Sequence, residues 1–185
     1  GLREAGADRA GLGLTLLRLD RVDEAAEEIR RAVELEPSSW AVQHARARLL
    51  LAQAKWEDAN AALERIAGLA ASPRTKGELT LARALYYDGT GNIALAESEA
   101  VAALNLDPAD PERLAVANRI CQRRGGPDVS IALLEQIKRD AGPTPPPSVL
   151  TELGRVYMVG RRFNEARDQF VAAVAVDVDA VQAHV

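Results

Sequence analysis

The feature that most limits the fold of this chain is an internal repeat that returns every 34 to 37 residues. A residue that is usually small begins each copy, at positions 13, 47, 84, 118 and 154, and we call it the lead residue. A fixed period of this length is typical of proteins in which one supersecondary unit is stacked on the next. The chain is therefore expected to be a stack of five similar units.

The first and last copies of the repeat share one pattern of side chains. Offsets of +3, +12, +16 and +19 hold Leu16, Ala25, Ile29 and Ala32 after Gly13, and Tyr157, Ala166, Phe170 and Ala173 after Gly154. The second and third copies keep the pattern with Ala47 and Ala84 as lead residues. The fourth copy departs from it, with Asn118 as lead residue and Ser130 at +12.

Close packing of two helices explains the pattern. Small residues at the lead and +12 positions let the two helices of a pair approach each other, and larger residues at +3 and +16 fill the space beside that contact. Ala and Leu dominate the composition and aromatic residues make up only 4%, which favours helices over sheets. Each pair leaves apolar surface on both sides, so neighbouring pairs must stack.

Turn-forming residues lie where the pattern requires the chain to reverse. Within the pairs these segments are 19–21, 54–55, 89–92, 125–128 and 160–161. Asp110 before Pro111 predicts a helix start, and so does Pro147. The two longer spacings contain loop-like sequence at 71–75 and 142–147, where insertions cost little. The prolines at 145–147 are expected to be a stiff connector, with a polyproline ligand as the alternative.

These offsets, with the closing Pro37 and Pro108, resemble the tetratricopeptide repeat over nearly the whole chain. The resemblance implies an all-α fold, an α-solenoid in the form of a right-handed superhelix of antiparallel helix pairs. We expect one solenoid domain over residues 1–180. Its repeats lie at about 6–39, 40–75, 77–110, 111–146 and 147–180, and residues 181–185 begin a further helix. We therefore expect a fragment of a larger bacterial protein.

Composition argues against several classes of function. A net charge of −4 does not provide the basic surface that nucleic-acid binding needs. Cys121 is the only cysteine, and the two histidines, His44 and His184, lie in distant repeats, so we expect no metal site and no cofactor. At +3 of the fourth repeat, Cys121 is expected to be a buried apolar residue, with a reactive thiol as the alternative. No apolar run is long enough to cross a membrane.

The resemblance also indicates where a partner binds. In this family the first helices of the pairs line a concave groove, which implies a partner-binding site along them. The expected groove residues are Arg18, His44, Arg48, Leu51, Leu85, Asp88, Arg119, Gln122, Arg123, Arg155 and Met158.

In three repeats the groove position directly after the lead residue is an arginine: Arg48, Arg119 and Arg155. Arginine can hold a carboxylate through two parallel hydrogen bonds, so the expected partner is an acidic or C-terminal peptide. The alternative is that these side chains are ordinary solvated surface. Family members that clamp the carboxylate of chaperone tails use asparagine where Gly11 or Leu14 and Ala45 stand here, so that role is not expected.

The expected function is a non-catalytic scaffold that binds a protein or peptide. One alternative is a docking or regulatory segment of a larger multidomain enzyme or redox protein, and another is an RNA-binding helical repeat. Self-association through the uncapped C-terminal end is a further expectation. The sequence does not identify the partner or the compartment.

Overall fold

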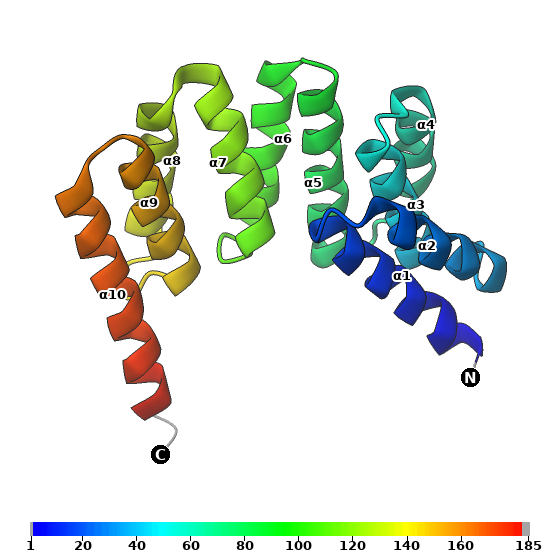
Figure 1. Ribbon diagram of the computed structural model, residues 1–185, viewed down its shortest axis with the longest axis horizontal. Coiled ribbons are helices and arrows are strands. Elements are labelled where there is room, and N and C mark those ends of the chain that lie inside the picture. The colour runs from blue at the N-terminus through cyan, green and yellow to red at the C-terminus, as the bar shows by residue number, and fades with distance from the viewer. Residues whose placement is uncertain (1, 183–185) are drawn as a thin grey trace. The chain divides into compact units, whose positions relative to one another are not determined.

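The computed structural model describes residues 2–182, which form ten α-helices and no strand (Figure 1). The helices are α1 Leu2–Arg18, α2 Val22–Leu35, α3 Trp40–Ala52, α4 Trp56–Ala67, α5 Pro73–Gly89, α6 Ile93–Leu106, α7 Pro111–Gly125, α8 Pro127–Asp140, α9 Pro147–Val159 and α10 Phe163–Gln182. The all-α fold class is confirmed, and each reversal within a pair falls at the predicted turn.

The chain divides into two compact units, Gly1–Asn92 and Ile93–Val185. The division falls in the turn between α5 and α6, the two helices of the third repeat. The first unit therefore holds the pairs α1–α2 and α3–α4 with α5, and the second holds α6 with the pairs α7–α8 and α9–α10. The single solenoid domain over residues 1–180 stays a prediction.

In the first unit, each second helix packs between its own partner and the next first helix. α2 contacts α1 and α3, and α4 contacts α3 and α5. Gly13 shows why the lead residue must be small, because a Cβ there would lie 2.5 Å from Cγ1 of Ile29, at +16. Ala25 at +12 is fully buried. The predicted contact between the lead position and +16 is therefore present in α1–α2.

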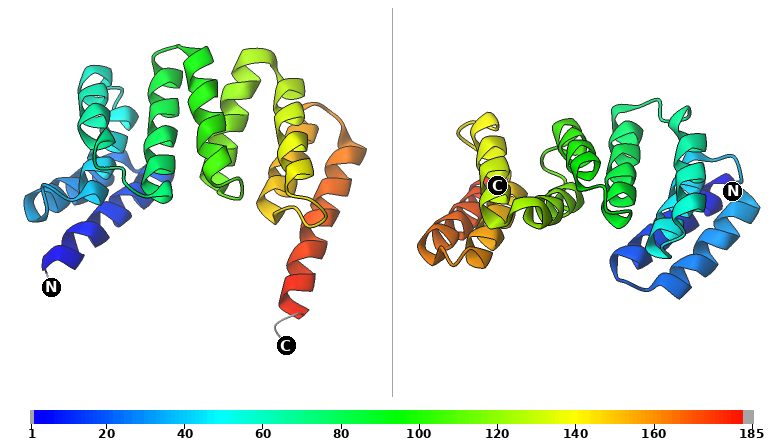
Figure 2. Two further views of the ribbon diagram at one scale, coloured as in Figure 1. Left: turned by 180° about the vertical axis from the view of Figure 1, so that it is seen from behind. Right: turned by 90° about the horizontal axis from the view of Figure 1, so that it is seen from above.

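The second unit repeats this arrangement. α9 contacts both α8 and α10 (Figure 2). A Cβ on Gly154 would lie 2.5 Å from the Phe170 ring, again at +16. In the fourth repeat a hydrogen bond replaces the usual contact of small side chains, because the Ser130 hydroxyl donates to the backbone oxygen of Asn118 over 3.1 Å. Ser130 is fully buried, so this bond satisfies the polar atom that the substitution introduces.

Tight turns join the helices of a pair, and four of them place the residue at +7 in the left-handed region. These residues are Asp20, Ala54, Gly91 and Arg161, with φ of 58°, 54°, 81° and 58°. Only Gly91 adopts this backbone without a steric penalty. The turn geometry is thus kept in repeats whose sequence does not favour it.

Helix starts follow the predicted signals. Asp110 caps α7 by accepting from the Arg113 N–H, and Pro111 and Pro147 occupy first-turn positions. Ser72 and Thr75 form a reciprocal capping box at the start of α5, which the sequence reasoning did not predict.

α10 is one continuous helix through Val181 and Gln182. Of the further helix expected at 181–185, residues 183–185 lie outside the described part of the chain. Within residues 2–182, no helix is both long and apolar enough to span a membrane.

Candidate functional site

First helices of neighbouring repeats lie side by side within each unit. α1 contacts α3 and α3 contacts α5 in the first unit, and α7 contacts α9 in the second (Figure 1). The predicted groove residues therefore fall into two sets. The first unit holds Arg18, His44, Arg48, Leu51, Leu85 and Asp88, and the second holds Arg119, Gln122, Arg123, Arg155 and Met158.

Half of the first set is buried. His44, Leu51 and Asp88 are 2%, 7% and 7% exposed, whereas Arg48 and Leu85 are half-buried and Arg18 is exposed. In this unit the predicted positions contribute more to packing between repeats than to open surface.

His44 illustrates this packing role. Its ring stacks on Trp40 of the same helix, with centroids 4.7 Å apart. Its Nδ1 lies 3.6 Å from a carboxylate oxygen of Glu78 on α5. The side chain thus links α3 to α5 inside the unit.

The second set is mostly exposed. Arg119, Arg123, Arg155 and Met158 are exposed, and Gln122 is half-buried. These residues lie three or four positions apart on their helices, so they share one side of α7 and one side of α9. We call this surface, defined by the same five residues, the α7–α9 face.

A buried polar network joins α7 to α9 beneath this face. The Asn118 side-chain amide donates to Glu152 over 2.5 Å, and Gln122 donates to the side-chain oxygen Oδ1 of Asn118 over 2.7 Å. Glu152 also pairs with Arg155 over 3.2 Å. Asn118 and Glu152 are only 8% and 7% exposed. Sequence reasoning missed the network, although the polar residue at the lead position of repeat four was its visible signal.

The network gives the α7–α9 face its charge. The Glu152 carboxylate lies below the surface, while the Arg155 side chain is 68% exposed. Glu152 accepts a hydrogen bond from one nitrogen of the Arg155 guanidinium, which has five N–H donors. The charged groups of the face that reach solvent are therefore the three arginines.

Cys121 lies in the core of α7, as predicted from its +3 position, and is 2% exposed. Burial, reinforced by the nearby Glu97 carboxylate, raises the pKa of the thiol to about 11. A thiol with such a pKa stays protonated at neutral pH, and the thiolate is the reactive form. Cys121 therefore packs as an apolar side chain. Among residues 2–182, no three His, Cys, Asp or Glu side chains are grouped so that they could hold a metal ion.

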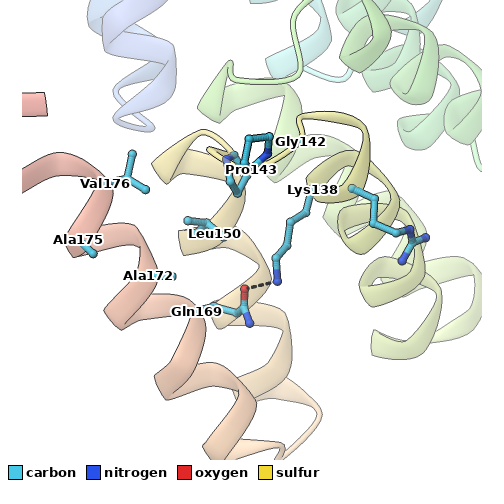
Figure 3. Close-up of a pocket in the computed structure, with 10 residues that line it drawn as sticks. Lys138, Gly142, Pro143, Leu150, Gln169, Ala172, Ala175 and Val176 are labelled. Atoms are coloured by element: carbon cyan, nitrogen blue, oxygen red, sulfur yellow. Dashed lines mark hydrogen bonds between the residues drawn. The ribbon is translucent and has the colours of Figure 1, made fainter. Parts of the chain in front are cut away.

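A cavity of about 530 Å³ lies where the long loop before α9 meets α8 and α10 (Figure 3). Pro143, Pro145 and Leu150 supply apolar lining, and Lys138 donates to Gln169 over 2.9 Å at one side. Pro145 lines the cavity and Pro147 starts α9. The proline run therefore packs as a connector, and its alternative role as a polyproline ligand has no support in this packing.

The comparisons with known proteins agree with this fold. Residues 10–39 match the family model of the tetratricopeptide repeat. Two solved structures superpose with a TM-score of 0.61: a thermophilic tetratricopeptide protein of Thermus thermophilus, at 20% identity, and the nearly identical tetratricopeptide-like repeats of a protein assigned as a kinesin light chain in Podospora anserina, at 19%. Each match covers 97% of this chain and 98% of the other.

PilF of Pseudomonas aeruginosa superposes with a TM-score of 0.58 at 18% identity, covering 94% of this chain and 78% of its own. No curated protein matches the chain in sequence. Residues 10–39 thus match the tetratricopeptide repeat in sequence, and the described residues share the fold of solved tetratricopeptide-repeat proteins. Solenoids of stacked helical repeats provide extended surfaces that bind other proteins.

Proposed function

We propose that this chain is a non-catalytic scaffold that binds an acidic peptide segment, and that the α7–α9 face is its main contact. One observation carries the proposal. On this face the arginines at +1, Arg119 and Arg155, are exposed on adjacent first helices, while the neighbouring carboxylate of Glu152 is buried beneath them.

The exposed arginines of the face are suited to binding carboxylates. A guanidinium is a planar fork that matches a carboxylate through two parallel hydrogen bonds. Met158 lies on the same side of α9 as Arg155 and is 48% exposed. Its flexible thioether side chain can adapt to different apolar neighbours in a ligand. A short segment with acidic residues and one apolar residue therefore fits the face.

Selection of peptides from a displayed random library tests the proposal. We expect the chain to enrich acidic sequences. Arg119→Glu combined with Arg155→Glu should weaken the selected peptides at least about tenfold, because charge-assisted hydrogen bonds are replaced by repulsion. Affinity is measured by fluorescence anisotropy, and circular dichroism checks that helicity is unchanged.

A matched control separates the face from net charge. Arg65 and Arg139 lie exposed on the second helices α4 and α8. Changing both to Glu alters the net charge equally and should leave peptide affinity unchanged. Enrichment of sequences without acidic residues, or equal weakening by both double variants, would contradict the proposal.

A further inference from the structure

Asn118 on α7 and Glu152 on α9 form a polar contact at repeat positions that are apolar in the first unit. Asn118 is the lead residue of its repeat, and Glu152 lies two positions before the next lead residue. In the first unit the same two positions hold Ala47 and Ala82, which are fully buried in one apolar cluster. Small apolar side chains therefore suffice to pack neighbouring first helices at this point.

A buried carboxylate is a costly way to fill such a contact. Glu152 is 7% exposed, and its removal from water requires partners for both carboxylate oxygens. Asn118 donates to Oε1 and Arg155 donates to Oε2. Apolar residues in place of a buried ion pair often leave stability unchanged or raise it. Packing alone does not call for this arrangement, whereas its place beneath the α7–α9 face connects it with binding.

From this arrangement we infer that Asn118 is a positioning residue for the α7–α9 face. It keeps the Glu152 carboxylate below the surface, so that the donors of Arg155 remain open to a ligand. Asn118 is itself only 8% exposed and acts from beneath the face. The inference rests on the proposed function, because it concerns the affinity of that face for an acidic peptide.

The Asn118 amide holds the carboxylate from its inner side. Its Nδ2 donates to Oε1 of Glu152 over 2.5 Å, while its Oδ1 accepts from Gln122 over 2.7 Å. Arg155 reaches Oε2 with one nitrogen, over 3.2 Å. Without Asn118 the carboxylate loses its buried donor, so its flexible side chain turns towards water and Arg155. A negative charge then lies among the exposed arginines.

An outward Glu152 weakens an acidic ligand in two ways. It occupies donors of Arg155 that the ligand would use, and it repels the carboxylates of the ligand. Asn118→Ala leaves the net charge of the chain unchanged, so these effects come from the placement of existing charges. The tightest acidic peptide from the library selection should bind Asn118→Ala about three- to tenfold more weakly than the unchanged chain.

A double-mutant cycle in peptide affinity separates this role from a structural one. In the Glu152→Ala background there is no carboxylate to hold, so Asn118→Ala should change affinity there by less than about twofold. A general loosening of α7 would weaken binding in both backgrounds. Fluorescence anisotropy gives the affinities at a temperature where circular dichroism shows all four proteins folded. If Asn118→Ala does not fold, Asn118→Ser replaces it, because the serine hydroxyl is one bond too short to take over the amide's contacts.

Salt provides a second readout. The loss in Asn118→Ala comes from a charge moved to the surface, so the affinity ratio of the unchanged chain to the variant should fall towards one between about 0.05 and 0.5 M NaCl. A loss caused by altered packing would not depend on salt in this way. Ser130→Ala is the matched control. It removes the hydrogen bond to the Asn118 backbone, leaves the side-chain network in place and should leave affinity unchanged.

The outcomes distinguish this role from the proposed function. If Arg119→Glu with Arg155→Glu weakens the selected acidic peptides but Asn118→Ala binds them as tightly as the unchanged chain, the proposed function stands and the positioning role is rejected. Equal losses in both backgrounds of the cycle, or an equal loss in Ser130→Ala, reject it as well. If no acidic sequence is enriched, the proposed function fails and the positioning role fails with it.

Discussion

At the scale of single residues, the lead position shows how the absence of a side chain lets the two helices of a pair pack closely. Gly11 and Gly13 lie in the same helix, but only Gly13 faces α2. A Cβ at Gly13 would meet Ile29, whereas a Cβ at Gly11 meets nothing within 4 Å. The two glycines therefore differ in packing while their helical backbone is the same.

This contrast gives the first prediction. Gly13→Ala should lower the free energy of unfolding by ~1–3 kcal/mol, because the new methyl group overpacks the contact with Ile29. Gly11→Ala should raise it by up to ~1 kcal/mol, because alanine favours the helix. Urea denaturation of both variants measures the difference. Equal effects of the two substitutions would show that Ile29 shifts at little cost.

Cys121 gives a prediction that depends on pH. Its folded pKa of about 11 exceeds the ordinary value of 9.0. In this interval the unfolded chain loses the thiol proton while the folded chain keeps it. Stability should therefore fall as the pH rises from 9.0 towards 11, by on the order of 1 kcal/mol per pH unit.

The control for this prediction is Cys121→Ala, which removes the thiol and should flatten the first part of the decline. Burial and a hydrogen bond to Glu135 raise the pKa of Tyr157 from 10.0 to about 12, so the tyrosine adds a decline only at higher pH. Urea midpoints at several alkaline pH values provide the measurement. If the unchanged chain and Cys121→Ala lose stability equally between pH 9.0 and 10.0, groups other than Cys121 cause the decline.

At the scale of helices, the sequence predicted most of the fold because its signals are local. Glycine, proline or asparagine marks the turns of the last three repeats, and the offsets from the lead residue set which helices pair. Burial on the first helices could not be predicted in this way. Leu51 and Met158 share the +4 position, yet they are 7% and 48% exposed. Exposure there depends on what the neighbouring repeat supplies, which the pattern within one repeat does not contain.

The fourth repeat makes this point in energetic terms. The repeat pattern alone predicts that Asn118→Ala stabilises the chain, because it restores the usual small residue. The structure predicts the opposite, because Asn118 donates to the buried Glu152 carboxylate. Removing that donor should destabilise the chain by ~1–3 kcal/mol.

A double-mutant cycle measures the network. Asn118→Ala combined with Glu152→Ala removes both partners, so no buried carboxylate loses its donor, and the pair should cost less than the sum of the single changes. Far-UV circular dichroism in urea follows all four proteins. Additive losses would show that the two side chains are not coupled.

At the scale of the whole molecule, the important feature is the division into two units within the third repeat. In repeat proteins each unit contacts mainly its neighbours, and stability is approximately a sum of local terms. The buried leucines and alanines of α3, α4 and α5 form a cluster entirely within the first unit. Such a molecule need not unfold in one step.

The tryptophans allow this to be tested without dividing the chain. Trp40 and Trp56 are the only two tryptophans, and both lie in the first unit. Their fluorescence reports on that unit alone, whereas far-UV circular dichroism reports on helices of both. If the units unfold separately, Asn118→Ala in the second unit should lower the dichroism midpoint in urea and leave the fluorescence midpoint unchanged. Gly13→Ala is the reciprocal control and should move the fluorescence transition. Equal shifts of both probes by either variant would show one cooperative unit, because coincident transitions are the test of two-state unfolding.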